Sequence, residues 1–170
     1  MNKVAVVLAV AALLTPLSSN ARSQTSQHSF NFNADGVRGI GTGEARIAGG
    51  GQYDPVSGVV KAGGSFRVLQ DISAGPLAGL KAGEGVKWDS DETLPSFSIK
   101  CTGAETPRTV FSGPNTVIMQ AEFYRAGDGN TASLHAVMFV SSDDQDGGIS
   151  GTQTVWIQGV GCDEARAEFH

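Results

Sequence analysis

Residues 45–68 read ARIAGGGQYDPVSGVVKAGGSFRV, and this stretch carries the strongest indication of the fold. The sequence DPVSG at 54–58 is typical of a tight turn, because proline presets one backbone angle of a turn and glycine accepts left-handed angles. Glycine clusters at 49–51 and 63–64 lie at similar distances on either side of that turn. Apolar residues alternate beyond both clusters, so the stretch predicts a β-hairpin whose two strands lack side chains near their middle.

The position of these glycines predicts a strongly bent hairpin. If Tyr53 pairs with Val59 across the turn, Gly49 lies opposite Gly63 and the small residues meet across the two strands. Glycine weakens a strand, and its recurrence on both partners indicates a sharp bend or the close approach of another segment. Barrels use such bends to curl their hairpins. A bend is favoured over a floppy surface hairpin because apolar residues flank the glycines: Ala45, Ile47, Phe66 and Val68.

Short strand-like segments separated by turn sequences fill the chain from residue 43 onward, and no segment has a helical period. The predicted strands are 43–53, 59–72, 85–89, 96–102, 116–125, 133–141 and 152–160. The predicted turns are 54–58, 126–130 and 143–148, and residues 73–83 are expected to form a longer crossover that carries Leu77 and Leu80 across an open end. This pattern predicts a single-domain, all-β protein with an antiparallel β-barrel, a two-sheet β-sandwich being the alternative.

The first residues have the order of a secretory signal peptide. A short positive start with Lys3 precedes an apolar run from Val4 to Leu14, and small residues follow as far as Ala21. This run is much shorter than the roughly 20 residues that span a bilayer as a helix. We therefore expect residues 1–21 to be cleaved and the protein to be exported, to the periplasm or out of the cell, without further attachment to a membrane.

The remaining residues divide into three predicted parts. Residues 22–42 are expected to be a flexible N-terminal arm with at most one edge strand, residues 43–162 the barrel, and residues 163–170 a charged, frayed tail. The formal charge of −5 becomes −6 when Lys3 is removed. This charge excludes the basic surface that a nucleic acid or an anionic membrane requires.

The two cysteines, Cys101 and Cys162, predict a single disulfide, because an exported chain meets an oxidising environment. Strand alternation places each cysteine on an apolar face. Phe97 and Ile99 share the face of Cys101, and Trp156 and Val160 share the face of Cys162. The bridge should therefore join two strands near their ends. Residues 155 and 157 make the other face of the last strand apolar too, and we expect the arm, the crossover or a second subunit to cover it.

His135 is the histidine that lies within a predicted strand. Pairing Arg125 with Thr131 across the 126–130 turn would set His135 opposite Ala121, on an apolar face, where a buried structural histidine is favoured. A slip of one residue would set it opposite Glu122, an arrangement suited to general acid/base chemistry. His135 and Glu122 are therefore the candidate catalytic pair. The candidate ligand-binding residues are His135, Met119, Tyr124 and Trp88.

Other chemistries have little support in the sequence. The nucleophile elbow G-x-S-x-G is not present, and the glycines of GIGTG at 39–43 lack the lysine and helix of a phosphate-binding loop. Asp144 and Asp146 match two ligand positions of a calcium loop, but the bidentate glutamate is missing, so a solvated turn is favoured. We expect no cofactor and no metal, and calcium at Asp144 and Asp146 stays open.

These observations favour an exported, non-enzymatic β-domain that binds a small apolar ligand or a protein partner. A small barrel enzyme, a cyclase or hydrolase using His135 with Glu122, is the first alternative. A structural or surface-interaction protein, in which an apolar outer face packs against another chain or an oligomeric partner, is the second. The barrel interior separates them: a lined cavity within reach of Glu122 or Tyr124 favours catalysis, and a filled interior favours interaction with another protein.

Overall fold

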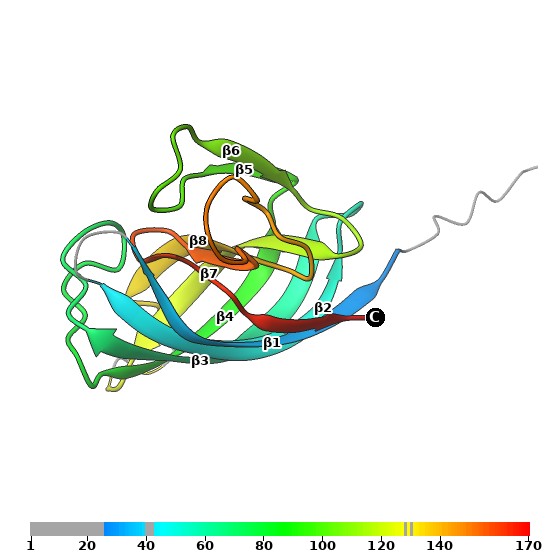
Figure 1. The fold of residues 1–170 in the computed structure, drawn as a ribbon. Coiled ribbons are helices and arrows are strands. Elements are labelled where there is room, and N and C mark those ends of the chain that lie inside the picture. Colours follow the sequence, from blue (N-terminus) through cyan, green and yellow to red (C-terminus); the bar gives the residue numbers. More distant parts are fainter. Residues whose placement is uncertain (1–25, 40–42, 128, 130) are drawn as a thin grey trace, which may run out of the picture.

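The structure is a computed structural model that describes residues 26–39, 43–127, 129 and 131–170 (Figure 1). All regular secondary structure in this part of the chain is β-strand. The strands are β1 (His28–Gly39), β2 (Glu44–Asp54), β3 (Val59–Gln70), β4 (Gly85–Thr93), β5 (Ser96–Ile99), β6 (Arg108–Phe111), β7 (Thr116–Arg125), β8 (Leu134–Ser141), β9 (Val155–Ile157), β10 (Gly161–Asp163) and β11 (Arg166–Phe169). No helix within the described residues is long and apolar enough to cross a membrane.

The main sheet closes into an antiparallel barrel. Neighbouring strands pair in the order β1-β2-β3-β4-β7-β8-β9-β10, and β10 returns to β1 with Arg38 opposite Cys162 and Gly39 opposite Gly161. Closure confirms the predicted barrel and excludes the two-sheet sandwich. The long strands β1 to β3 sweep around one side of the barrel in Figure 1.

The glycine-rich hairpin is formed by β2 and β3, but its predicted register was wrong by one residue. Tyr53 lies opposite Val60, so Gly49 lies opposite Gly64. The reason is the turn: Asp54 still belongs to the ladder, and its carbonyl oxygen accepts a hydrogen bond from the amide of Gly58 at 3.0 Å. The carboxylate of Asp54 also accepts a bond from the amide of Val56 at 2.9 Å, and this bond lowers the pKa of the carboxyl group.

Trp88 explains why the paired glycines are needed. In the ladder between β3 and β4, Trp88 lies opposite Gly64, and its indole nitrogen donates a hydrogen bond to the carbonyl oxygen of Ala48 at 3.2 Å. A Cβ atom on Gly64 would lie 2.8 Å from that nitrogen, and one on Gly49 would lie 3.1 Å from Cε2 of the same ring. The missing side chains therefore make room for a large interior ring, which is the close approach that the sequence indicated.

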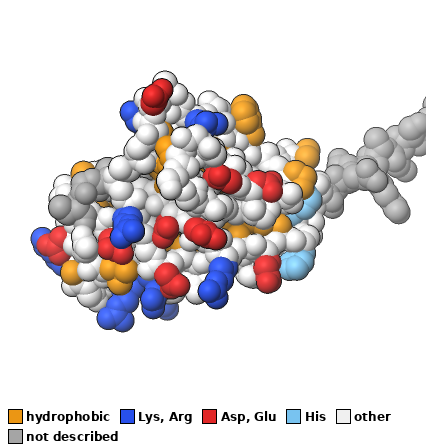
Figure 2. Space-filling model, in the orientation of Figure 1, with side chains coloured by type: hydrophobic (Ala, Val, Ile, Leu, Met, Phe, Trp, Pro, Cys, Tyr) orange, Lys and Arg blue, Asp and Glu red, His pale blue; other side chains and the backbone are white. Residues whose placement is uncertain are grey.

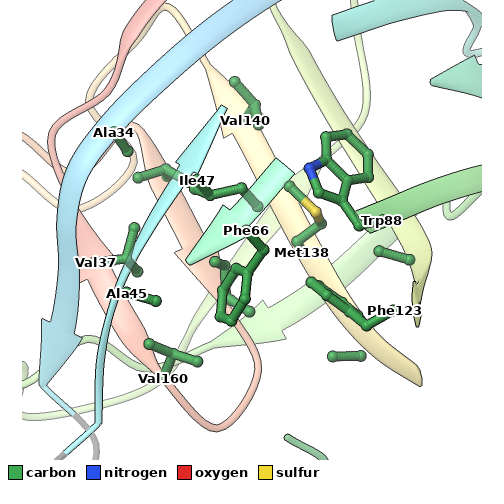
Figure 3. Close-up of a cluster of buried hydrophobic side chains, with 14 of the residues drawn as sticks. Ala34, Val37, Ala45, Ile47, Phe66, Trp88, Phe123, Met138, Val140 and Val160 are labelled. Atoms are coloured by element: carbon green, nitrogen blue, oxygen red, sulfur yellow. The ribbon is translucent and has the colours of Figure 1, made fainter. Parts of the chain in front are cut away.

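Large side chains fill the inside of the barrel. Figure 3 shows Phe66, Trp88, Phe123 and Met138 pointing into one space from four different strands, and all four are buried. Leu77 and Leu80 are fully buried against the same cluster, as expected for the 73–83 segment. That segment is a long hairpin loop, not a crossover, because the strands it joins, β3 and β4, are neighbours.

The ends of the described chain belong to the barrel, which corrects two expectations. Residues 28–39, expected to be part of a flexible arm, form β1, and residues 166–169, expected to be a frayed tail, form β11. Alternate residues from Phe30 to Ala34 and from Ala167 to Phe169 are apolar and pack inward, and Phe30 stacks on Phe169 with ring centroids 5.8 Å apart. The predicted signal peptide, residues 1–21, lies outside the described residues.

A small second sheet covers one outer face of the barrel. Strands β5 and β6 pair with each other, and their apolar residues pack on outward-facing residues of β7, β8 and β9. Cys101 and Cys162 form the predicted disulfide at the border of this layer, with a Cα–Cα distance of 5.5 Å, which fits an oxidising environment. The members of this outer cluster are Ile99, Cys101, Val110, Ile118, Val137, Phe139, Trp156 and Cys162.

The outer cluster corrects the expected faces of the last strand. Val160 lies in the barrel interior and not beside Trp156, because Gly159 has a left-handed φ of 83° and breaks the alternation. Val155 and Ile157 also face the interior. The outward apolar face is that of Trp156, and the β5–β6 hairpin covers it. The sequence had instead suggested the arm, the crossover or a second subunit as the cover.

Burial of Tyr53 should make the free energy of unfolding fall at alkaline pH. Its buried hydroxyl group donates to the carbonyl oxygen of Gly113 at 2.7 Å, and burial raises its pKa from 10.0 to about 12. Between these values the unfolded chain loses a proton that the folded chain keeps, so stability present below pH 10 is lost as pH rises towards 12. We expect the free energy of unfolding to fall by up to about 2 kcal/mol in this range. Urea titrations at several pH values should show a smaller fall for Tyr53→Phe; an equal fall would contradict this role.

Candidate functional site

A row of polar side chains crosses the outer wall of the barrel over strands β4, β7 and β8. The alternation of β7 sets this row, since Ala121 and Phe123 must face the core and Glu122 and Tyr124 therefore face outward. Glu122 lies opposite His135 of β8, and their side chains approach to 3.8 Å between Oε1 and Nδ1. The second of the two registers considered for His135 is therefore the one observed.

His135 is not a buried structural histidine, so the interpretation favoured by the sequence was wrong. Its side chain is 55% exposed, and Ala121 pairs with Ala136 instead. The core decides the register, because inward packing of Leu134, Ala136 and Met138 forces the residue between the first two to point outward. The pairing of Arg125 with Thr131 does not form, and the amide of Ser133 bonds to the carbonyl oxygen of Phe123.

Tyr124 joins two carboxylates across neighbouring strands. Its hydroxyl oxygen lies 2.7 Å from Oε2 of Glu122 and 3.0 Å from Oδ1 of Asp89, which is one strand away on β4. The hydrogen bond to Glu122, and then burial and Asp89, raise the pKa of Tyr124, since both carboxylates oppose a second negative charge. The phenol is therefore a firm hydrogen-bond donor over the whole physiological range and not a general base.

A groove of about 410 Å³ lies beside this row, and its floor is made by the hairpin glycines. Gly50 and Gly63 lie opposite each other in the ladder, next to the pair that accommodates Trp88 inside. The same hairpin thus lacks side chains on both faces. The walls of the groove carry charged and hydroxyl groups: Lys61, Asp89, Ser90, Asp91, Glu122 and Tyr124.

A bulge in β4 shapes the groove wall. The pairing of β4 with β7 is regular from Val86 to Asp89 and resumes at Glu92, so Ser90 and Asp91 lie in the irregular part. The hydroxyl group of Ser90 is buried and donates to the carbonyl oxygen of Gln120 at 2.7 Å, which fixes the bulge. Asp91 is left exposed at the groove.

The candidate residues do not all meet at one site. Glu122, His135 and Tyr124 lie together on the outer wall, whereas Met119 and Trp88 are buried inside the barrel. Asp89 was not among the predicted site residues, although it follows Trp88 and must therefore take the opposite face of β4. The glycine floor was also missed, because the glycines were interpreted as a bend or as the close approach of another segment and not as part of a binding surface.

The acidic loop has other partners. A carboxylate oxygen of Asp144 accepts hydrogen bonds from the amides of Asp146 and Gln153 at 3.0 and 2.9 Å. Asp146 is buried, and its Oδ1 lies 2.6 Å from Nε of Arg108 on β6. Residues 143–148 thus help to hold the small second sheet. Across residues 26–39, 43–127, 129 and 131–170, no group of three or more histidine, cysteine, aspartate or glutamate side chains could hold a metal ion.

Comparison of the chain with models of protein families, with curated proteins and with solved structures finds no match. The geometry of the outer wall is therefore the basis for inferring function. The open polar groove lies over a packed core and can bind the surface of another molecule. Its lining offers several hydrogen-bond acceptors, one phenolic donor and one ammonium group.

Proposed function

We propose that this chain is an exported binding domain without enzymatic activity, and that it holds a protein partner on the outer wall of the barrel, at the groove beside Tyr124. The packed barrel interior supports this proposal most directly. Trp88, Phe66 and Phe123 are at most 2% exposed and occupy the volume in which a small apolar ligand would otherwise lie. A filled barrel of this size is a scaffold, and its binding surface is outside.

The composition of the groove fits a protein partner better than a small apolar molecule. Its walls are mostly charged or hydroxylated, like the polar rim of protein interfaces, and it is open to solvent. Asp89, Asp91 and Glu122 outnumber the single cation, Lys61, and the whole chain has a formal charge of −5. This balance favours a partner surface that carries basic side chains.

Export rests on the N-terminal residues and on the disulfide. The apolar run at 4–14 and the small residues before position 22 have the order of a cleavable signal, and the Cys101–Cys162 bridge fits an oxidising compartment. The exported protein should begin at Arg22, which mass spectrometry of its N-terminal peptide would verify.

Photo-crosslinking tests the binding surface. A benzophenone amino acid that replaces Tyr124 should trap a protein partner when the exported chain is produced in its own organism and irradiated. The matched control carries the same group in place of Phe111, which is 65% exposed on β6 of the second sheet and does not line the groove. A discrete adduct at position 124 but not at position 111 supports the proposal. Equal adducts at both positions, or none at 124, would refute it.

A second candidate function is a hydrolase, because the observed register brings His135 and Glu122 together. If the pair is catalytic, His135 and Glu122 act together as a general acid/base pair on one proton. Replacing either residue by glutamine, as His135→Gln or Glu122→Gln, should then reduce turnover of an activated ester by about 100-fold. The exposure of both groups, 55% and 42%, weighs against this function, since nothing there excludes water from the reaction. Wild-type rates at the level of a buffer blank would remove it.

A further inference from the structure

Strand β11 presents a free edge, although the barrel itself is closed. It pairs with β1 on one side, and it is the terminal strand of the sheet within the described residues. Figure 1 shows it at the front of the barrel, ending at the C-terminus. Proteins usually protect such an edge by keeping the strand short or by placing charged side chains, a proline or a bulge on it. Strand β11 has no proline and no bulge, but it has only 4 residues, and Arg166 and Glu168 carry opposite charges on its exposed face.

The register shows which peptide groups face outward from the sheet. Ser29 and His170 exchange two hydrogen bonds of 2.8 Å, so they form a hydrogen-bonded pair of the antiparallel ladder. Because such pairs alternate with non-hydrogen-bonded ones, Ala167 and Phe169 do not bond to β1. Their amide and carbonyl groups point away from it, towards the free edge. Within residues 26–39, 43–127, 129 and 131–170, no hydrogen bond from elsewhere in the chain reaches them.

We propose that this edge pairs with the same edge of a second copy, forming a two-fold symmetric antiparallel dimer centred on Ala167. In that register the outward peptide groups of Ala167 bond to those of the other Ala167. Arg166 of each copy then lies directly across from Glu168 of the other. Both side chains are exposed on the same face of the strand, so two opposite-charge pairs form by symmetry.

The outward groups of Ala167 and Phe169 also allow registers centred on Glu168 and on Phe169, and of the three only the Ala167-centred one sets Arg166 opposite Glu168. Centring the pair on Glu168 would set two glutamates directly opposite each other, which is destabilising. The Ala167-centred register instead sets Arg166 opposite Glu168 twice on the outer face. Figure 2 views the molecule from this side and shows acidic and basic side chains close together there. A second copy is thus complementary to the edge in hydrogen bonds at Ala167 and in charge at Arg166 and Glu168. The surface is distinct from the groove beside Tyr124 and does not depend on the proposed function.

The dimer is expected to be weak, because four residues bury little surface and Thr154 already occupies the edge at Ala165. The Thr154 hydroxyl group exchanges hydrogen bonds of 2.7 and 3.2 Å with the Ala165 amide and carbonyl groups, which limits the new ladder to the β11 segment. We expect a dissociation constant on the order of 0.1 mM. Sedimentation velocity of the mature chain over a concentration series should show a reversible shift from monomer to dimer.

Charge reversal provides the specific test. Arg166→Glu puts glutamates opposite each other twice per dimer and should weaken association by about tenfold or more. The double variant Arg166→Glu with Glu168→Arg restores opposite charges in the symmetric register and should recover the wild-type constant. Recovery with an unchanged melting temperature supports the proposal. A wild type that stays monomeric at millimolar concentration, or a double variant that associates no better than the single one, would overturn it.

A proline variant keeps the test independent of charge. Ala167→Pro removes an amide that points to the free edge and takes no part in the ladder with β1, so it should abolish the dimer. Glu168→Pro is the matched control, because the amide of Glu168 belongs to a hydrogen-bonded pair with Asn31 and its loss should lower the melting temperature. An Ala167→Pro variant that keeps both the wild-type melting temperature and the wild-type association would contradict the proposed edge.

Discussion

Gly64→Ala is expected to destabilise the protein by about 3 kcal/mol or more, although alanine is normally the better residue in a strand. The added Cβ atom would overlap the carbonyl oxygen of Ala48 and lie 2.8 Å from the indole nitrogen of Trp88. Neither the ladder nor the buried ring can move without disturbing the interior, since Trp88 is 2% exposed. Urea denaturation followed by circular dichroism measures the loss.

Two further variants separate crowding from a general effect of the substitution. Gly85→Ala is the matched control: it lies in the same ladder, no atom is within 4 Å of its added Cβ, and its stability should be unchanged or slightly higher. Trp88→Leu in the Gly64→Ala background should recover part of the lost stability, because the smaller side chain vacates the space. A Gly64→Ala protein as stable as the Gly85→Ala control would show that the glycine pair is not needed for the ring.

Removing the disulfide should have an effect of similar size. Replacing both Cys101 and Cys162 by serine removes a bridge between residues that are 61 positions apart. The unfolded chain then gains conformational entropy, and the free energy of unfolding should fall by roughly 4 kcal/mol on the chain-entropy model. Urea denaturation of oxidised wild type and of the double-serine variant measures the difference. Reductant should lower the midpoint of the wild type and leave the variant unchanged. Equal midpoints for the two proteins would contradict this role.

The disulfide also holds the small second sheet, so its loss should expose the outer cluster before the barrel unfolds. Trp156 is 5% exposed beneath Phe97, with ring centroids 5.6 Å apart. In the double-serine variant its fluorescence should shift towards that of a hydrated indole at urea concentrations at which the far-ultraviolet circular dichroism is still native. Simultaneous loss of both signals would instead show that the second sheet and the barrel unfold as one unit.

Strand alternation and turn chemistry were enough to predict the barrel and several of its strands. The predicted strand at 116–125 coincides with β7, and the ends of β2 and β3 were predicted to within two residues. Strand β1 was expected at most as one edge strand in a flexible arm, because its FNFN alternation stands within a polar, glycine-containing stretch. The short strands β6, β10 and β11 carry too few residues for a period of two to be distinguished from a loop.

Both register errors have one physical origin. The number of residues in a turn decides the register, and turn sequences such as 54–58 and 126–130 are compatible with more than one length. Packing in the assembled barrel then makes the choice. His135 could have faced either way by its own sequence, and it faces solvent because Ala136 and Met138 fill the core. The candidate site follows from that choice, since it brings Glu122 beside His135 and places Met119 and Trp88 out of reach.

The accessibility of Trp88 tests most directly whether the barrel is a filled scaffold that binds only from outside. In a Trp156→Phe variant the remaining fluorescence comes from Trp88. An indole enclosed between two glycine strands should emit as in an apolar solvent, resist quenching by acrylamide, and give the same spectrum with and without an added apolar ligand such as a fatty acid. Ready quenching, or a spectrum that moves on titration with the fatty acid, would mean that the interior admits small molecules and that the binding site lies within.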